Sequence, residues 1–203
     1  MKVLNLYAGI GGNRKLWENV DVTAVENNPE IAKIYQEFFP KDKVIIGDAH
    51  QYLLEHFKEY DFIWSSPPCQ SHSVCNHFLK GQGIFRFPDM KLYEEIIFLK
   101  HFYKGKWVVE NVIPYYESLI KPTKVLHRHN FWSNFNITNK EFEGCNVGKA
   151  TKEVLAAYHG FDLPNCINQR LALRNCVKPE LGKHIFDCAF KIEQNTLFCE
   201  EDK

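Results

Sequence analysis

The sequence has no excess of either charge, no Cys-x-x-Cys pair and no long apolar run. The sequence has 25 Lys and Arg residues and the same number of Asp and Glu residues, 25. This balance argues against tight electrostatic binding to a nucleic-acid duplex but allows a local basic face. The seven cysteines are irregularly spaced, a pattern that fits neither structural zinc nor a disulfide framework. No apolar run approaches the ~20 residues that span a bilayer, so we expect no membrane association.

Length and hydrophobic content favour one folded domain. The chain has 203 residues, 45% of them hydrophobic, which is typical of a single domain with a buried core. We therefore predict a single domain over residues 1–203. Residues 1–6 resemble a strand and not a signal peptide, because no long apolar stretch or cleavage site follows them. We expect an intracellular protein, cytoplasmic if a bacterium or phage encodes it.

Short apolar runs alternate with helical patterns along the first two-thirds of the chain. The runs predict strands at 3–7, 22–25, 44–46, 61–64 and 107–109. The intervening patterns predict a helical stretch to residue 17 and helices at 29–39, 50–57 and 91–103, with later elements at 131–135, 151–159, 168–175 and 179–190. Strands separated by helices indicate an α/β fold with a mostly parallel sheet and helices on both faces. Residues 65–88 lack a period, which predicts a functional loop.

Glycines and acidic residues follow the first three predicted strands. The first strand ends in Tyr7-Ala8-Gly9-Ile10-Gly11-Gly12, where glycines allow a tight turn and close approach to a ligand. This spacing is not the dinucleotide G-x-G-x-x-G, which argues against a nicotinamide oxidoreductase. Glu26 after the second strand can accept from two ribose hydroxyls, and Asp48 after the third can accept from adenine N6. Each acid alone is equally compatible with a helix cap, but together they outline an adenosine pocket.

Two reactive side chains follow the fourth and fifth predicted strands. Cys69 stands in Pro67-Pro68-Cys69-Gln70 at the end of the fourth, where a thiol is a candidate nucleophile. A buried inert cysteine is the alternative, and the polar residues after it disfavour that interpretation. Glu110 follows the apolar residues 107–109. We expect desolvation there to favour its protonated form, which can donate to a ring nitrogen.

These segments together resemble the C5-cytosine DNA methyltransferase family. Residues 7–12, 67–70 and 110–112 resemble its motifs I, IV and VI, in that order along the chain. Residues 127–135 resemble motif VIII, most closely the form in vertebrate de novo methyltransferases, and residues 174–179 resemble the Asn-small-Val core of motif X. The resemblance covers residues 3–190 and implies a Rossmann-like, S-adenosylmethionine-dependent methyltransferase fold.

The resemblance also implies a cofactor and its binding residues. The methyl donor would be S-adenosylmethionine, leaving S-adenosylhomocysteine as the product, and no metal is required. The residues expected to bind it are Tyr7, Ala8, Gly9, Gly11, Gly12, Glu26, Asn27, Asp48, Ala49, Pro67, Asn175, Cys176 and Val177.

The family chemistry implies roles for three catalytic residues. Cys69 would attack C6 of cytosine, and C5 would then take the methyl group. Glu110 would engage N3 and the exocyclic amine, and Arg128 would contact the base edge or its phosphate. The substrate would be DNA, with the target base flipped out of a duplex. Restriction-modification, phage protection and regulation are all compatible biological roles.

Two departures from the family pattern leave target recognition open. Motif VIII often carries two arginines, but here His129 and Asn130 follow Arg128. The target recognition insertion is reduced to residues 136–166. Either specificity is low, or the loop 71–88 reads the sequence, or a second copy or protein partner supplies contacts. Two alternatives remain: a tRNA cytosine-5 methyltransferase with the same motifs, and a catalytically silent subunit that binds a cofactor or partner, against which intact Cys69, Glu110 and Asn175 argue.

Overall fold

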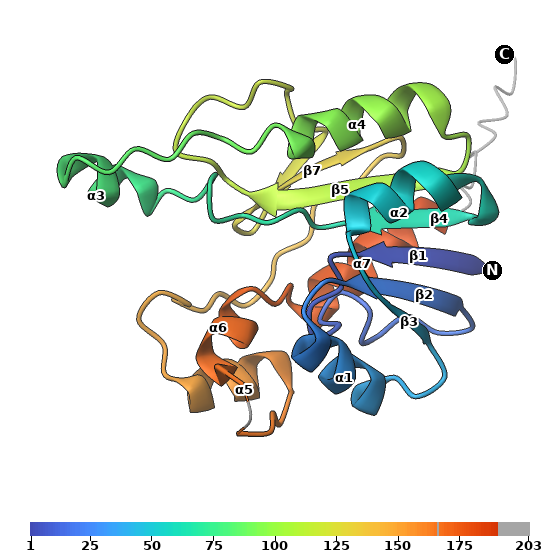
Figure 1. The fold of residues 1–203 in the computed structure, drawn as a ribbon, viewed down its shortest axis with the longest axis horizontal. Coiled ribbons are helices and arrows are strands. Elements are labelled where there is room, and N and C mark those ends of the chain that lie inside the picture. Colours follow the sequence, from blue (N-terminus) through green and yellow to red (C-terminus); the bar gives the residue numbers. More distant parts are fainter. Residues whose placement is uncertain (166, 191–203) are drawn as a thin grey trace, which may run out of the picture.

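A seven-stranded sheet forms the centre of the molecule, in the order β3-β2-β1-β4-β5-β7-β6 (Figure 1). The computed structural model describes residues 1–165 and 167–190; residue 166, the last of the predicted insertion, and residues 191–203 lie outside that range. The strands are β1 (Lys2–Leu6), β2 (Asp21–Glu26), β3 (Lys43–Ile46), β4 (Phe62–Ser65), β5 (Lys106–Val112), β6 (Lys124–Leu126) and β7 (His129–Ser133). Neighbours among β1 to β5 pair in parallel, whereas β7 runs antiparallel to β5. The predicted Rossmann-like α/β class is confirmed.

Helices cover both faces of this sheet, so its central strands are apolar on both sides. Leu4 and Ile63 pack in one cluster with residues of α2 and α4. Their strand neighbours Val3 and Trp64 point to the opposite face, where α7 covers them. The helices are α1 (Pro29–Phe38), α2 (Ala49–His56), α3 (Asn76–Gly81), α4 (Lys91–Phe102), α5 (Lys152–His159), α6 (Gln169–Arg174) and α7 (Pro179–Phe190), with a 3₁₀ turn η1 (Phe57–Glu59).

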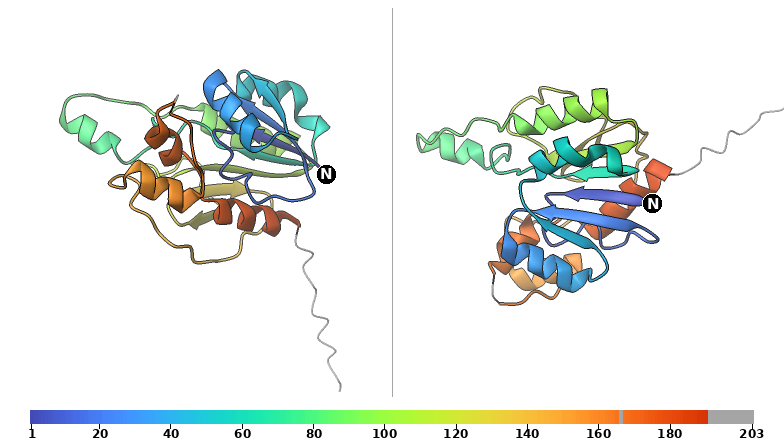
Figure 2. Two further views of the ribbon diagram at one scale, coloured as in Figure 1. Left: turned by 90° about the horizontal axis from the view of Figure 1, so that it is seen from below. Right: turned by 45° about the vertical axis from the view of Figure 1, so that its right-hand side comes forward.

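The strand order places a topological switch point between β1 and β4. From β1 the chain moves outward to β2 and β3, and then returns to the other side of β1 as β4. Open α/β sheets bind ligands beside the carboxyl ends of the strands at such a point. Two additions border this edge: a lobe formed by α5 and α6, and an arm, residues 70–88, that carries α3. Figure 2 shows the arm reaching well beyond the sheet.

The structure corrects two sequence predictions. The predicted helical stretch up to Trp17 is wrong, because residues 9–19 form turns. Tertiary contacts hold these turns: the Trp17 indole donates to the Gly182 carbonyl, and Gly182 lies so close to Asn13 that a Cβ would collide with its backbone. The loop predicted at 65–88 contains the short helix α3. Among the described residues, no helix has the length and apolarity needed to cross a membrane.

Candidate active site

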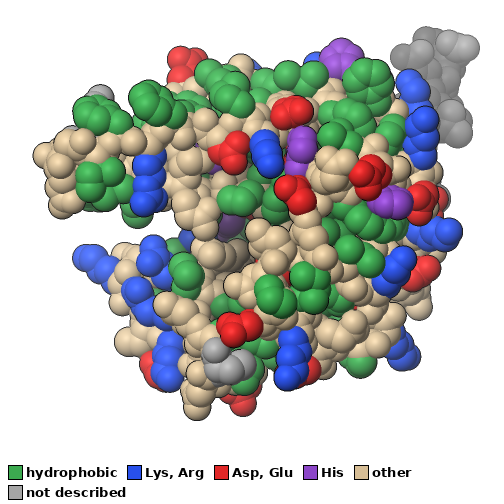
Figure 3. Space-filling view, in the orientation of Figure 1, with side chains coloured by type: hydrophobic (Ala, Val, Ile, Leu, Met, Phe, Trp, Pro, Cys, Tyr) green, Lys and Arg blue, Asp and Glu red, His purple; other side chains and the backbone are tan. Residues whose placement is uncertain are grey.

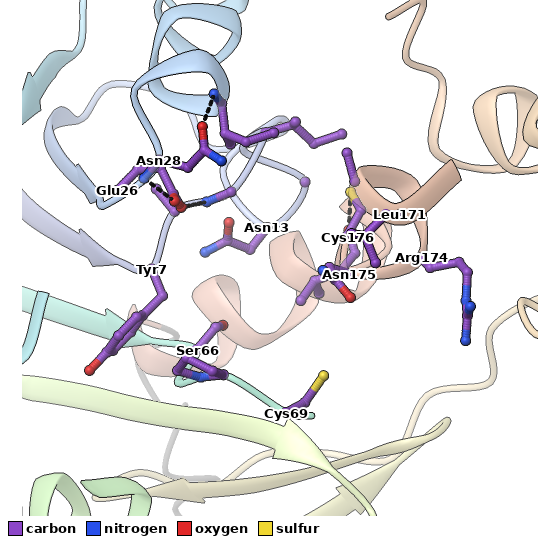
Figure 4. Close-up of a pocket in the computed structure, with 18 of the residues that line it drawn as sticks. Tyr7, Asn13, Glu26, Asn28, Ser66, Cys69, Leu171, Arg174, Asn175 and Cys176 are labelled. Atoms are coloured by element: carbon purple, nitrogen blue, oxygen red, sulfur yellow. Dashed lines mark hydrogen bonds between the residues drawn. The ribbon is translucent and has the colours of Figure 1, made fainter. Parts of the chain in front are cut away.

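A cavity of about 550 Å³ lies at the carboxyl ends of the parallel strands. This volume is within the range of small-molecule and cofactor sites. Figure 4 shows that its walls come from the sheet on one side and from α6 and the segment after it on the other. Most predicted site residues line it: Tyr7, Ala8, Gly9, Gly12, Glu26, Asn27, Pro67, Cys69, Glu110, Arg128, Asn175, Cys176 and Val177.

Glu26 is held rigidly at the end of β2, on the rim of the cavity. One carboxylate oxygen accepts from the Gly9 N–H at 2.9 Å and the other accepts from the Asn28 N–H at 2.9 Å. Gly9 has a φ of +55°, and no atom lies within 4 Å of the position its Cβ would take. A side chain there would be strained and would project into open space. The turn after β1 is therefore both fixed and kept clear for a ligand.

Gly12 allows the segment after α6 to pack against this same turn. A Cβ on Gly12 would lie 2.2 Å from the Cys176 Sγ and 2.4 Å from the Val177 carbonyl oxygen. Burial raises the pKa of the Cys176 thiol to about 12, and the thiol donates to the Val177 carbonyl at 3.4 Å. Cys176 is therefore a packing residue, and it closes the cavity without contributing a nucleophile.

Three predicted cofactor residues do not line the cavity. Gly11 has a φ of +82° and lies against the Phe39 ring, 2.3 Å from its hypothetical Cβ. The exposed Asp48 caps α2 by accepting from the Gln51 N–H at 3.1 Å. Ala49 is buried under the sheet in the cluster that contains α4. The structure therefore supports packing and capping roles for these residues, and it does not bring Asp48 to the site predicted for adenine.

Cys69 lies in the cavity on the loop after β4. Asn111 of β5 donates through Nδ2 to the Pro67 carbonyl at 2.9 Å, which ties the Pro-Pro turn to the neighbouring strand. Burial raises the pKa of the Cys69 thiol, the charge of Glu110 raises it further, and Arg128 and Arg174 act in the opposite direction. Formation of the nucleophilic thiolate is therefore sensitive to the charge on Glu110.

Both oxygens of Glu110 accept hydrogen bonds. Ser66 donates to Oε2 at 2.8 Å, and His129 Nδ1 lies 2.5 Å from Oε1. The Trp64 indole N–H donates to the Ser66 hydroxyl at 2.8 Å, which directs the hydroxyl proton towards Glu110. Burial acts to raise the pKa of Glu110, but His129, Ser66 and the charge of Arg128 outweigh it and lower the pKa. The expectation of a protonated Glu110 is therefore wrong: desolvation is real, but its partners overcompensate.

A buried acid absent from the predicted site holds Tyr7 in place. Glu95 of α4 is fully buried. It accepts from the Tyr7 hydroxyl at 2.6 Å and from the Ser65 hydroxyl at 2.5 Å, and it lies 3.1 Å from His50 Nδ1. Its hydrogen bond to His50 raises the pKa of that imidazole. One sequence signal existed, because Glu95 lies on the apolar face of its helix, three residues after the buried Leu92.

Two arginines and an exposed arm border the opening of the cavity. Arg128 donates to the Arg174 carbonyl at 3.4 Å. Within residues 1–165 and 167–190, neither guanidinium forms an ion pair. Figure 3 shows a notch between the arm, which carries hydrophobic side chains, and the α5–α6 lobe, along which Lys and Arg side chains gather. The arm exposes Phe78, Phe85 and Phe87.

Comparison with solved structures gives partial matches. A mutant of DNMT2 from Spodoptera frugiperda is 25% identical, with 55% of this chain and 35% of that chain covered and a TM-score of 0.41. The methyltransferase EhMeth from Entamoeba histolytica is 20% identical, with 59% and 40% covered and a TM-score of 0.38. This chain spans well under half the length of either protein.

Comparison by sequence gives the family. No curated protein sequence matches the chain. The family model for C-5 cytosine-specific DNA methylase, however, matches residues 1–145. This match includes β1 to β7, Cys69, Glu110 and Arg128. The chain therefore belongs to the C-5 cytosine-specific DNA methylase family, whose methyl donor is S-adenosylmethionine.

Proposed function

We propose that this chain transfers a methyl group to C5 of cytosine in DNA through a covalent bond between Cys69 and C6. The observation that carries the proposal is the convergence of Cys69, Glu110 and Arg128 on the cavity that also contains Glu26 and the glycine turn. These three side chains come from three different loops and strands of the sheet edge. Such a convergence is expected of a nucleophile beside the groups that stabilise developing charge.

The cavity is compatible with S-adenosylmethionine. When bound, this cofactor supplies a methyl group on a positively charged sulfur. The fixed carboxylate of Glu26 is suited to accept from two ribose hydroxyls. The open position beside Gly9 leaves room for a ligand against the turn, and Asn175 and Val177 line the opposite wall.

The residues of the chain would act on the cytosine one after another. The Cys69 thiolate forms a bond to C6, and the C5–C6 electron pair becomes available at C5. Glu110 accepts from the exocyclic amine, while the cationic Arg128 is placed to contact the base edge or its phosphate and to offset the charge that develops on the ring. C5 would then bond to the methyl carbon as the bond from that carbon to the cofactor sulfur breaks, which would leave S-adenosylhomocysteine. Loss of the C5 proton to water, with departure of the Cys69 sulfur as thiolate, would restore the aromatic ring as 5-methylcytosine and free the nucleophile.

The opening of the cavity favours a polynucleotide over a free nucleoside. Arg128 and Arg174 are cations without carboxylate partners within 4.0 Å among the described residues, so they are available to phosphates. The exposed rings of Phe78, Phe85 and Phe87 can stack on or wedge between bases. Because the insertion 136–165 contains only α5 as regular structure, we propose that the arm, a second copy or a protein partner contributes to target recognition.

Covalent trapping tests both nucleophile and substrate. The chain is incubated with S-adenosylmethionine and DNA containing 5-fluorocytosine, whose fluorine blocks the final elimination. We expect an adduct on the peptide that contains Cys69, identified by mass spectrometry. Cys69→Ser should form no adduct, whereas Cys75→Ser, which changes an exposed thiol on the arm, should form it normally.

The same experiment separates the alternatives. A matched RNA containing 5-fluorocytosine is tested in parallel. An adduct with RNA alone would replace the DNA proposal with a tRNA-type activity. No adduct with either polymer, by a protein that still binds the cofactor in calorimetry, would indicate a catalytically silent subunit.

A further inference from the structure

His129 and Glu110 form a buried pair that follows from the sheet geometry. In the β5–β7 ladder, Val112 pairs with His129 and Glu110 pairs with Phe131. Glu110 and His129 are thus diagonal neighbours on one face of an antiparallel pair, within reach of long side chains. Their side chains are 7% and 5% exposed, and 2.5 Å separates Nδ1 from Oε1. His129 also lines the cavity.

The charge of Glu110 creates a problem for the proposed reaction. An ionised carboxylate raises the pKa of the Cys69 thiol and so disfavours the nucleophile. The bond from Cys69 to C6 then transfers the negative charge of the thiolate onto the pyrimidine ring, next to that same carboxylate. In a buried site this repulsion is only weakly screened. A partner that cancels the charge of Glu110 would favour both steps.

We infer that His129 is a positioning residue whose imidazolium form neutralises Glu110 and thereby favours the Cys69 thiolate and its attack on C6. The inference rests on the proposed function for its consequence in catalysis. It assigns a role to the histidine that follows Arg128, where the motif often has a second arginine. Unlike the fixed charge of an arginine, the charge of an imidazole can be lost, so His129→Arg provides a permanently charged comparison.

Titratable and charged groups from several elements surround the His129–Glu110 pair. Glu110 is the carboxylate that contacts His129 within the described part of the chain. Its own hairpin contributes Arg128 and the His127 ring, which is stacked 6.3 Å from the His129 ring. On the other elements, His159 of α5 interacts with His129 and also with Lys15 before β2 and Lys178 before α7, and Arg174 of α6 acts on Cys69.

Alkylation of Cys69 measures this coupling without any methyl transfer. Iodoacetamide reacts with the thiolate, and mass spectrometry of the Cys69 peptide separates its rate from those of other cysteines. His129→Asn can still donate a hydrogen bond but carries no charge, whereas His129→Arg carries a fixed charge. At one pH we expect Cys69 to react about tenfold more slowly in the Asn variant than in the Arg variant, as expected for loss of one nearby charge.

As pH rises, the alkylation rate of Cys69 in the wild-type protein should change from that of His129→Arg to that of His129→Asn. At low pH its alkylation rate should match that of His129→Arg, and at high pH that of His129→Asn. Equal rates in the two variants, or a wild-type rate that follows His129→Asn at every pH, would overturn the inference. If a variant fails to fold, the wild-type curve remains decisive. Below its pKa a single uncoupled thiol gives a tenfold rate increase per pH unit, and coupling flattens the curve where the His129–Glu110 pair changes its net charge.

Methyl transfer gives a second readout. Wild-type turnover should fall at alkaline pH, whereas His129→Arg should reach a plateau without that fall. Absence of methyl transfer in the wild type, together with the alkylation crossover, would reject the proposed function and retain the His129–Glu110–Cys69 coupling. Full wild-type turnover with an unchanged pH profile in His129→Asn would reject the inference and retain the proposed function.

Discussion

Substitution of Gly12 by alanine should separate two parts of the molecule that close the cofactor cavity. The added Cβ would lie 2.2 Å from the Cys176 Sγ and 2.4 Å from the Val177 carbonyl oxygen. Both distances are far below van der Waals contact, and the carbonyl belongs to the backbone. Rotation of the Cys176 side chain relieves only the first clash. The segment that contains Asn175 and Val177, which lines the cavity, must therefore move away from the turn.

Overpacking of this kind costs about 1–3 kcal/mol. For a chain of this length, each kcal/mol lowers Tm by about 2–4 °C, so we expect a fall of about 2–12 °C in thermal unfolding. S-adenosylmethionine affinity, measured by calorimetry, should fall as well, because one wall of the cavity is displaced.

Gly47→Ala is the matched control. Nothing lies within 4 Å of a Cβ at Gly47, so its Tm and cofactor affinity should match the wild type. A second variant, Gly12→Ala with Cys176→Ala, should recover only part of the loss, because the clash with the Val177 carbonyl remains. A Gly12→Ala protein with wild-type Tm and cofactor affinity would refute the idea that contact between the turn after β1 and residues 175–177 shapes the site.

Three further predictions concern the buried polar network. Glu95→Gln should destabilise the fold by about 1–3 kcal/mol, because an amide cannot accept from all the donors around it, and should weaken cofactor binding through Tyr7; an unchanged denaturant midpoint would contradict this. Asn111→Ala should slow Cys69 alkylation or turnover with little change in cofactor affinity, since it removes the hydrogen bond to the Pro67 carbonyl. Rates equal to those of the wild type would show that the Pro-Pro segment keeps its conformation without this bond. The folded-state pKa of Glu110 is lowered, so its ionisation stabilises the fold above the unfolded-state pKa of about 4.3, and this contribution is lost as the pH falls below that value. A Glu110→Gln protein should therefore lose less stability than the wild type between neutral pH and pH 3. An identical pH dependence of stability in the two proteins would reject this prediction.

The element pattern of the sheet was readable from the sequence. Strands buried on both faces appear as continuous apolar runs, such as residues 62–64 and 107–109. The alternation of these runs with helical patterns was enough to predict parallel pairing and to place Cys69 and Glu110 at the same edge. The turn region up to Trp17 was mistaken for a helix, because contacts with Gly182, which is far away in the sequence, help to hold it in turns.

The candidate site, too, could be predicted from the sequence only in part. Glu26, Cys69 and Glu110 could be predicted because each directly follows a strand, and strand ends at one edge of a parallel sheet must lie close together. Their electrostatic state could not be predicted. The protonation of Glu110 depends on Ser66, which follows β4, and on His129 of β7.

The sequence by itself therefore determined which residues gather at the sheet edge, since hydrophobic periodicity dictates where the strands end. Only the tertiary structure decided which of them interact with a charged partner. Asp48 remained outside the cavity as a helix cap, and Glu110 acquired a histidine partner from the antiparallel strand β7. The physical reason is range: periodicity is a local property of the chain, whereas a pKa is set by groups that lie close in space at any distance in sequence.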